Sequence, residues 1–171
     1  EERVLAVIPF FHVYGMTTAM NLGVLMGASL ILIPKFHTKE VLHFINKYRP
    51  TIFPGIQAMY MAIGNYPKIH KYDLTSIKAA ISGAGPLMRE VQERFEQLTK
   101  ARIVEGYGLS EASPVTHCNP VFGKRKLGSI GLPFPDMDAK IMDIETGENE
   151  MPVGEPGELV LTSLTKQAMP V

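Results

Sequence analysis

Short apolar runs alternate along the chain with segments that carry apolar residues at helical spacing. Runs rich in β-branched residues predict strands at residues 4–8, 29–33, 51–53, 77–82 and 102–105. Helical spacing predicts helices between them, at residues 13–26, 37–50, 54–67 and 87–100. Strands that alternate with helices are typical of a parallel sheet covered by helices on both faces. We therefore expect an α/β fold.

The pattern changes after residue 120, where the chain is dense in glycine and proline and loses the helical period. The segments AKIMDI (139–144) and ELVLTS (158–163) alternate polar and apolar residues, and ETGE (145–148) is a hairpin-type turn. We expect a small antiparallel β appendage here. The predicted division is an α/β segment at residues 1–125 and a β-rich segment at residues 126–171.

One long stretch has no acidic residue, lysine or arginine. It runs from Val4 to Pro34 and is long enough to cross a bilayer. Pro9, Asn21 and Gly27 interrupt it, and these interruptions favour a buried core helix followed by a buried strand over a transmembrane segment.

Charge and cysteine content argue against several classes of protein. The chain has 17 basic and 17 acidic residues, so its net charge of zero argues against nucleic-acid partners. The single cysteine, Cys118, excludes an intrachain disulfide framework and fits a reducing compartment, so we expect a cytoplasmic location. An acidic start without methionine and an end without a closing element predict an excised piece of a longer protein. The GKRK cluster (123–126) is expected to be a solvated turn rather than an anion site.

Candidate chemistry falls at strand ends, where open parallel sheets bind ligands. Gly83-Ala84-Gly85-Pro86 follows one predicted strand and precedes a helix, with Pro86 near the helix start. Glycines let the backbone approach a ligand, and a helix N-terminus supplies free N–H groups. The third glycine of the dinucleotide fingerprint is missing, so these residues alone leave open an ordinary tight turn.

The sequence EGYGLSE (105–111) follows the next predicted strand. Tyr107, between two glycines, can offer a ring face to an aromatic base. Ser110 can donate to a phosphate oxygen, and Glu111 can hold Mg²⁺. The alternative makes Ser110 a helix N-cap with Glu111 as its dipole partner, although Pro114 limits any such helix to about one turn.

Histidines give weaker signals. His12 in PFFHVYG lacks a second ligand at metal-binding spacing, and a lone histidine of this kind is more often a packed residue. His117 and Cys118 likewise lack partners, and no G-x-S-x-G sequence supports a hydrolase triad.

The stretches PFFHVYG, SGAGPL and EGYGLSEASPVTHCNP resemble core motifs of the acyl-adenylate-forming (AMP-binding) superfamily. The similarity runs from Val4 to Gly157 and is closest to long-chain fatty-acid–CoA ligases. Such enzymes convert a carboxylate to an acyl-AMP with Mg-ATP and then transfer the acyl group to coenzyme A. The resemblance therefore implies ATP or AMP, Mg²⁺, coenzyme A and a fatty-acid or aryl carboxylate as partners. It also leaves room for peripheral membrane contact by the complete enzyme.

The resemblance also implies residue roles. Gly83 to Pro86 would lie along the adenine, Tyr107 would stack on it, and Ser110, where relatives usually carry threonine, would contact the α-phosphate. The implied cofactor-binding residues are Gly83, Ala84, Gly85, Pro86, Glu105, Gly106, Tyr107, Gly108, Leu109 and Ser110. The implied substrate-binding residues are His12, Tyr14, Gly15, Gly55, Gly106 and Gly108. The implied catalytic residues are His12, Ser110 and Glu111, with Glu111 as the Mg²⁺ ligand.

Parts of the family pattern lie outside this sequence. They are the phosphate loop, the ribose-binding aspartate and the C-terminal domain with its catalytic lysine, so the isolated piece is expected to be inactive. The end of the chain, GELVLTSLTKQAMPV (157–171), resembles phenylacetate–CoA ligases instead, which keeps an aryl substrate open. A non-catalytic binding module with the same fold is the remaining alternative. The intact set Tyr107, Ser110 and Glu111 favours the enzyme, because a decayed module should have lost the hydroxyl or the acid.

Overall fold

The computed structural model describes residues 1–163. Contacts divide the chain into two compact units, Glu1–Leu132 and Pro133–Val171. The first holds a mostly parallel sheet with helices, and the second holds a two-stranded antiparallel sheet. The predicted fold class, an α/β sheet followed by a small antiparallel appendage, is confirmed.

The larger sheet has the strand order β2-β1-β3-β4-β5-β6-β7. Neighbours from β2 to β5 run parallel, and β6 then pairs antiparallel with β5. The antiparallel strand β6 was not predicted. The strands are β1 (Arg3–Ala6), β2 (Ser29–Leu32), β3 (Ile52–Gly55), β4 (Ala79–Ser82), β5 (Arg102–Gly108), β6 (Val115–Cys118) and β7 (Leu132–Pro133).

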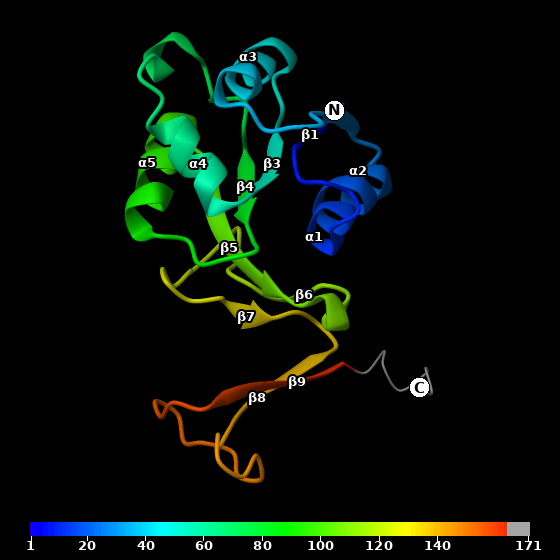
Figure 1. Cartoon of the computed structure of the whole chain (residues 1–171), viewed down its shortest axis with the longest axis vertical. Coiled ribbons are helices and arrows are strands. Elements are labelled where there is room, and N and C mark those ends of the chain that lie inside the picture. The colour runs from blue at the N-terminus through cyan, green and yellow to red at the C-terminus, as the bar shows by residue number, and fades with distance from the viewer. Residues whose placement is uncertain (164–171) are drawn as a thin grey trace. The chain divides into compact units, whose positions relative to one another are not determined.

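Helices connect the parallel strands. Figure 1 shows α4 and α5 on one side of the sheet and α1 and α2 on the other. The first helical segment is continuous, and its middle is a π-helix. The helices are α1 (Val13–Gly15), the π-helix η1 (Met16–Asn21), α2 (Leu22–Leu25), α3 (Thr38–Tyr48), α4 (Gln57–Gly64), the short 3-10 helix η2 (Ile69–Lys71), α5 (Arg89–Thr99) and the short 3-10 helix η3 (Ser110–Ala112).

Alternation along the strands sends apolar side chains to both faces. Leu5 joins the large core under α3, α4 and α5, whereas Val4 joins a smaller cluster with Ala19 under the first helical segment. At the centre of the large core, Tyr60 of α4 packs edge-on against Phe95 of α5, with ring centroids 4.7 Å apart. Both faces of the sheet are therefore covered by apolar contacts from helices.

The first helical segment and β2 are less buried than predicted. Leu25 is 85% exposed and Leu32 is 60% exposed, so the prediction of a buried helix and a buried strand is wrong for these positions. The reason is that β2 is the edge strand of the sheet and the helical segment presents only a narrow stripe, including Thr18 and Ala19, to the sheet. Among residues 1–163, no helix has the length and hydropathy of a membrane span.

In the second unit, β8 (Met137–Met142) pairs antiparallel with β9 (Glu158–Ser163), in a register from Met137 opposite Ser163 to Met142 opposite Glu158. A turn follows β8, where the carboxylate of Asp143 accepts hydrogen bonds from the backbone N–H groups of Glu145 and Thr146. Residues 164–171, the end of the segment that resembles phenylacetate–CoA ligases, lie outside the described residues.

Candidate active site

The predicted site residues gather at the carboxyl edge of the parallel strands. Strands β4 and β5 are neighbours with Ser82 opposite Glu105, so the two glycine-containing loops leave the sheet side by side. The Tyr14 hydroxyl lies 2.7 Å from the carbonyl oxygen of Ile81 and 3.0 Å from that of Gly55. The loop after β1 therefore reaches the same edge of the sheet.

The loop after β4 is anchored at its ends and open in its middle. Gly83 and Leu87 are buried, whereas Ala84, Gly85 and Pro86 are exposed. Ala84 has a φ of 60°, a conformation that residues with a side chain rarely adopt. Helix α5 begins at Arg89 with Met88 as its N-cap, so Pro86 lies two residues before the cap, near the helix start but in the loop rather than in the first turn. The exposed backbone at 84–86 is accessible to a ligand.

The two glycines at the end of β5 have different surroundings. A Cβ at Gly108 would lie 1.9 Å from the carbonyl oxygen of Pro114, which also accepts a 2.8 Å hydrogen bond from the N–H of Leu109. A Cβ at Gly106 would meet nothing closer than 3.6 Å. The tight turn thus requires glycine at 108, whereas the described residues would accept a methyl group at 106 in ordinary contact.

Tyr107, the predicted adenine platform, is half-buried and contacts His117, a residue for which the sequence indicated no partner. Its ring lies edge-on to His117, with centroids 6.3 Å apart. His117 is 4% exposed, its Nδ1 lies 3.0 Å from the Thr116 hydroxyl, and burial lowers its pKa. The antiparallel pairing of Tyr107 with His117 creates this contact. Without a predicted β6, the sequence held no signal for it.

Ser110 and Glu111 form the exposed rim of the same loop. They open the 3-10 helix η3, which ends at Ala112 with Ser113 as its C-cap just before Pro114, so it is as short as the position of the proline predicted. Leu109 rather than Ser110 is the N-cap residue, so the Ser110 hydroxyl does not cap this helix. Leu109 is 40% exposed.

The side chains of this loop can be compared with the ligands that a metal ion needs. Within residues 1–163 no three His, Cys, Asp or Glu side chains come together as a metal site. The exposed carboxylate of Glu111 fits Mg²⁺, because this ion is commonly held by one or two carboxylates together with nucleotide phosphates. Its role as a metal ligand stays a prediction.

Glu105 precedes Tyr107 on β5. It is half-buried, and burial raises the pKa of its carboxyl group, an effect that the N–H of Leu87 partly offsets. Its carbonyl accepts a 3.0 Å hydrogen bond from the N–H of Asn119, which holds the chain after β6 against β5. A small polar cleft adjoins this side chain, lined by Gln92, Val104, Glu105, Asn119, Arg125, Lys126, Leu127 and Gly128.

His12 and Gly15 have local structural roles at the start of the first helical segment. His12 is exposed, and its Nδ1 accepts a 3.1 Å hydrogen bond from the N–H of Tyr14, which makes it a helix N-cap. A Cβ at Gly15 would lie 2.5 Å from the carbonyl oxygen of Pro9. Among the described residues, no side-chain hydrogen bond joins His12 to Ser110 or Glu111. The implied catalytic role of His12 stays a prediction.

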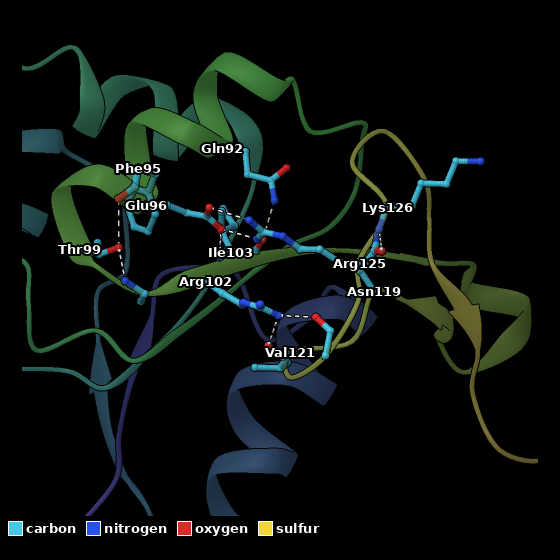
Figure 2. A network of polar contacts seen from close by, with 12 residues as sticks. Gln92, Phe95, Glu96, Thr99, Arg102, Ile103, Asn119, Val121, Arg125 and Lys126 are labelled. Atoms are coloured by element: carbon cyan, nitrogen blue, oxygen red, sulfur yellow. Dashed lines mark hydrogen bonds and ion pairs between the residues drawn. The ribbon is translucent and has the colours of Figure 1, made fainter.

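An ion-pair network behind β5 was also missed. Arg125 binds the carboxylate of Glu96 on α5 and donates a 3.0 Å hydrogen bond to the carbonyl of Ile103, as Figure 2 shows. The Arg125 side chain is only 19% exposed, so the predicted solvated turn at residues 123–126 is wrong for this residue. Nothing in the sequence pairs Glu96 of this helix with a loop residue far along the chain.

The AMP-binding enzyme family matches residues 1–166 of the chain. The chain belongs to this family. The predicted resemblance is confirmed, and with it the prediction of a ligase-type AMP-binding fold.

Individual members of the family that are similar to this chain are CoA ligases. The chain is 49% identical over 160 residues to a long-chain-fatty-acid–CoA ligase of Bacillus subtilis, an alignment that covers 94% of this chain and 28% of that protein. It is 36% identical over 162 residues to a probable 4-coumarate–CoA ligase 1 of Dictyostelium discoideum, with 94% and 29% covered. The crystal structure of an anthranilate CoA ligase in complex with anthranoyl-AMP superposes with a TM-score of 0.89 at 26% identity, over 96% of this chain and 32% of that one. The chain thus spans about a third or less of the length of each of these three relatives.

Proposed function

We propose that the chain is a segment of an ATP-dependent ligase that activates a long-chain fatty acid as its acyl-AMP and transfers the acyl group to coenzyme A. The observation that carries this proposal is the 49% identity to the Bacillus subtilis fatty-acid ligase, against 36% to a 4-coumarate ligase over the same share of the chain. The catalytic equipment outside this segment includes the phosphate loop, the ribose-binding aspartate and the C-terminal lysine. For that reason we propose that the segment is inactive by itself.

Different residues at the strand ends are proposed to bind different parts of the acyl-adenylate. Backbone atoms of Ala84, Gly85 and Pro86 are open to solvent and suit the edge of an adenine ring. Tyr107 supplies a ring of fixed orientation, since His117 supports its edge. The reacting carboxylate is proposed to bind beside Gly106, where the residue carries no side chain and a Cβ would lie 3.6 Å from the Ile81 side chain. Catalysis by such a site rests on positioning and charge stabilisation.

Ser110 and Glu111 lie on the exposed rim, where the phosphates would lie. The Ser110 hydroxyl donates to a phosphate oxygen in this proposal, and the Glu111 carboxylate holds Mg²⁺ beside it. When bound, Mg²⁺ neutralises charge on the phosphates. The carboxylate of Glu111 is free to turn toward the metal, because it projects from a short helix into solvent.

An aryl-CoA ligase is the second candidate. It is favoured by the TM-score of 0.89 with the anthranilate CoA ligase and by the matches to 4-coumarate–CoA ligases. The two candidates share the adenylate half of the site and differ in the acyl channel, beside which His12, Gly15 and Gly55 are proposed to lie.

The test is carboxylate-dependent exchange of labelled pyrophosphate into ATP by the complete protein that carries this chain. Palmitate and 4-coumarate are compared at equal concentrations. Exchange with palmitate but not with 4-coumarate is expected, and the reverse preference would establish the aryl candidate. Glu111→Gln should abolish exchange while leaving the thermal unfolding midpoint unchanged. Exchange with neither acid by the folded protein would refute the ligase proposal, and exchange by the 171-residue chain alone would refute its inactivity.

A further inference from the structure

Two tyrosine hydroxyls meet at one backbone carbonyl where β3 and β4 end. The hydroxyl of Tyr14 and that of Tyr60 each lie 2.7 Å from the carbonyl oxygen of Ile81. Each also has a second acceptor: the Gly55 carbonyl lies 3.0 Å from the Tyr14 hydroxyl, and the Phe53 carbonyl lies 2.9 Å from the Tyr60 hydroxyl. Tyr60 belongs to α4 on one face of the sheet, and Tyr14 to α1 on the other. The strand ends are therefore held from both faces.

Both tyrosine side chains are buried, and both hydroxyls are hydrogen-bonded within the protein. Tyr14 is 7% exposed and Tyr60 is 1% exposed. Burial raises the pKa of both phenols above the ordinary value, so both hydroxyls remain protonated donors at neutral pH. The single proton of the Tyr14 hydroxyl is directed to the backbone carbonyls at the strand ends, so it is already used within the protein.

Of the two rings, Tyr14 is the one that supports the glycine loop. A Cβ at Gly83 would lie 2.9 Å from Cζ and 3.0 Å from Cε2 of Tyr14, so the ring lies directly against the Gly83 backbone. The Gly83 N–H donates to the Gly55 carbonyl, which Tyr14 also contacts. Beyond Gly83 the loop faces solvent, and a Cβ at Gly85 would meet no atom within 4 Å. Tyr14 thus supports one side of a loop whose other side is open.

We propose that Tyr14 is a positioning residue: its ring and hydroxyl set the conformation of Gly83–Gly85, and Tyr14 itself contacts neither the carboxylate nor the thiol. The identification of the ligand as the adenine of ATP rests on the proposed function. The contacts with Gly83, Gly55 and Ile81 hold without that function. Physically, a loop held at the correct angle before the ligand arrives loses less conformational freedom on binding.

Tyr60 provides a matched control. It is buried like Tyr14 and donates to the same Ile81 carbonyl, yet its ring packs edge-on against Phe53 and Phe95, at 5.1 Å and 4.7 Å between centroids. The glycine that its ring lies against is Gly55 on β3, not Gly83 of the loop. Tyr14→Phe and Tyr60→Phe each remove one buried hydroxyl and keep the ring. A difference between the two variants in nucleotide binding therefore reports on the glycine loop rather than on lost stability.

The experiment measures steady-state kinetics of the complete ligase with each variant. For Tyr14→Phe we expect KM for ATP to rise about two- to tenfold, the factor that corresponds to one buried neutral hydrogen bond. KM for the carboxylate and for coenzyme A should stay within about twofold, as should all KM values of Tyr60→Phe. A raised KM for the carboxylate or coenzyme A alone would show direct contact and overturn the proposal. Equal changes in ATP affinity for both variants, or none in either, would also overturn it.

A second measurement separates this proposal from the proposed function. Amide hydrogen exchange of the complete protein should be at least about threefold faster at Gly83 in Tyr14→Phe, and unchanged in Tyr60→Phe, because local opening becomes easier when an anchoring contact is lost. This readout needs no catalysis, so it still tests Tyr14 if the wild-type protein shows no ligase activity. If Tyr14→Phe does not fold, Gly83→Ala replaces it, since the new Cβ would press on the Tyr14 ring. An unchanged KM for ATP in folded Gly83→Ala would refute the positioning role.

Discussion

Arg125 and Glu96 form a two-pronged ion pair, in which Nη2 of Arg125 lies 2.7 Å from Oε2 of Glu96 and Nη1 binds Oε1. The same two side chains engage both backbone groups of Ile103: Glu96 accepts its N–H at 2.9 Å, and Arg125 donates to its carbonyl at 3.0 Å. Gln92 donates to the same carbonyl at 2.9 Å. Figure 2 shows how this network ties helix α5, strand β5 and the loop after β6 together. Tyr107 lies near the end of the same strand β5.

Arg125→Met should therefore destabilise the protein. The substitution leaves the Glu96 carboxylate, which is 21% exposed, without its partner and removes a donor from the Ile103 carbonyl. The expected loss is about 1–3 kcal/mol of unfolding free energy. Urea unfolding measures it. Lys124→Met is the control, because this neighbouring lysine is exposed, and its effect should stay within about 0.5 kcal/mol. Equal effects of the two substitutions would contradict a specific role for the ion pair.

Two glutamates near β5 should shift stability with pH in opposite directions. Burial acts to raise the pKa of Glu96, but the hydrogen bonds from Arg125 and Ile103 outweigh it and hold the pKa below 4.5. Burial raises the pKa of Glu105 above 4.5. A lowered folded-state pKa gives stability that is present above 4.5 and lost as the pH falls through the folded value. A raised one gives stability that is present below 4.5 and lost as the pH rises through the folded value.

Glu96→Gln should accordingly be less stable than the wild type at pH 7, and the difference should shrink as the pH falls below 4.5. Glu105→Gln should be more stable than the wild type at pH 7, with an advantage that vanishes at low pH. Thermal unfolding midpoints between pH 3 and pH 7 measure both, over roughly the range in which carboxylates titrate. Parallel pH profiles for the two variants would show that neither environment perturbs its carboxyl group as described.

A glycine in place of Lys100, at the C-terminal end of helix α5, should increase the stability of the protein. Lys100 has a φ of 63° and donates its N–H to the carbonyl of Glu96 at 2.8 Å, which is the left-handed helix end that glycine favours. Lys100→Gly should raise the unfolding free energy by about 0.5–1 kcal/mol, because the relief of strain exceeds the added freedom of the unfolded chain. Arg49 has a φ of 53° at the end of α3, but its side chain is paired with Asp73. Arg49→Gly should therefore gain less than Lys100→Gly, and a larger gain at Arg49 would contradict the argument.

The sequence was most informative where the physical signal is local. The amphipathic pattern with Val91 and Phe95 located α5, and the alternation of strands with helices predicted the parallel sheet. Contacts between distant segments were not predictable, because no local pattern encodes them. The ion pair of Glu96 with Arg125 joins positions 29 residues apart, and the contact of Tyr107 with His117 depends on an antiparallel strand that carries no strong periodicity.

The solvent exposure of individual side chains was the other feature that could not be predicted correctly from the sequence. The apolar residues around Leu25 read as buried, yet the helix turns them away from the sheet. Similarly, the motifs placed Tyr14 near a ligand but did not show that its ring lies against Gly83. A motif identifies which residues gather at a strand end, whereas packing decides which of them face the ligand.

His12 offers a way to separate a cap from a chemical role. Its Nδ1 accepts the N–H of Tyr14, and asparagine can provide the same acceptor. His12→Ala should cost about 0.5–2 kcal/mol of unfolding free energy, whereas His12→Asn should restore most of that loss. Both are measured by urea unfolding, together with pyrophosphate exchange in the complete ligase. If His12→Asn is stable but has lost activity, the imidazole contributes to the reaction. Full activity in His12→Asn would reduce His12 to a helix cap.

The glycines at 106 and 108 should respond differently to alanine, since their surroundings differ so much. At Gly108 the new Cβ would lie 1.9 Å from the backbone oxygen of Pro114, which cannot move without breaking the turn to Leu109. Gly108→Ala should cost about 1–3 kcal/mol of stability. At Gly106 the nearest atom lies 3.6 Å away, so Gly106→Ala should unfold at nearly the wild-type denaturant concentration.

For Gly106, enzyme kinetics rather than protein stability provides the test of function. If the reacting carboxylate binds beside Gly106, Gly106→Ala should raise KM for the fatty acid, or lower kcat, in a protein of normal stability. Gly106→Ala with normal stability and normal kinetics would show that the space at 106 is not used by the substrate. Gly108→Ala cannot answer this question, because lost stability and lost activity would coincide there. The substitution at 106 is therefore the sharper test of where the carboxylate binds.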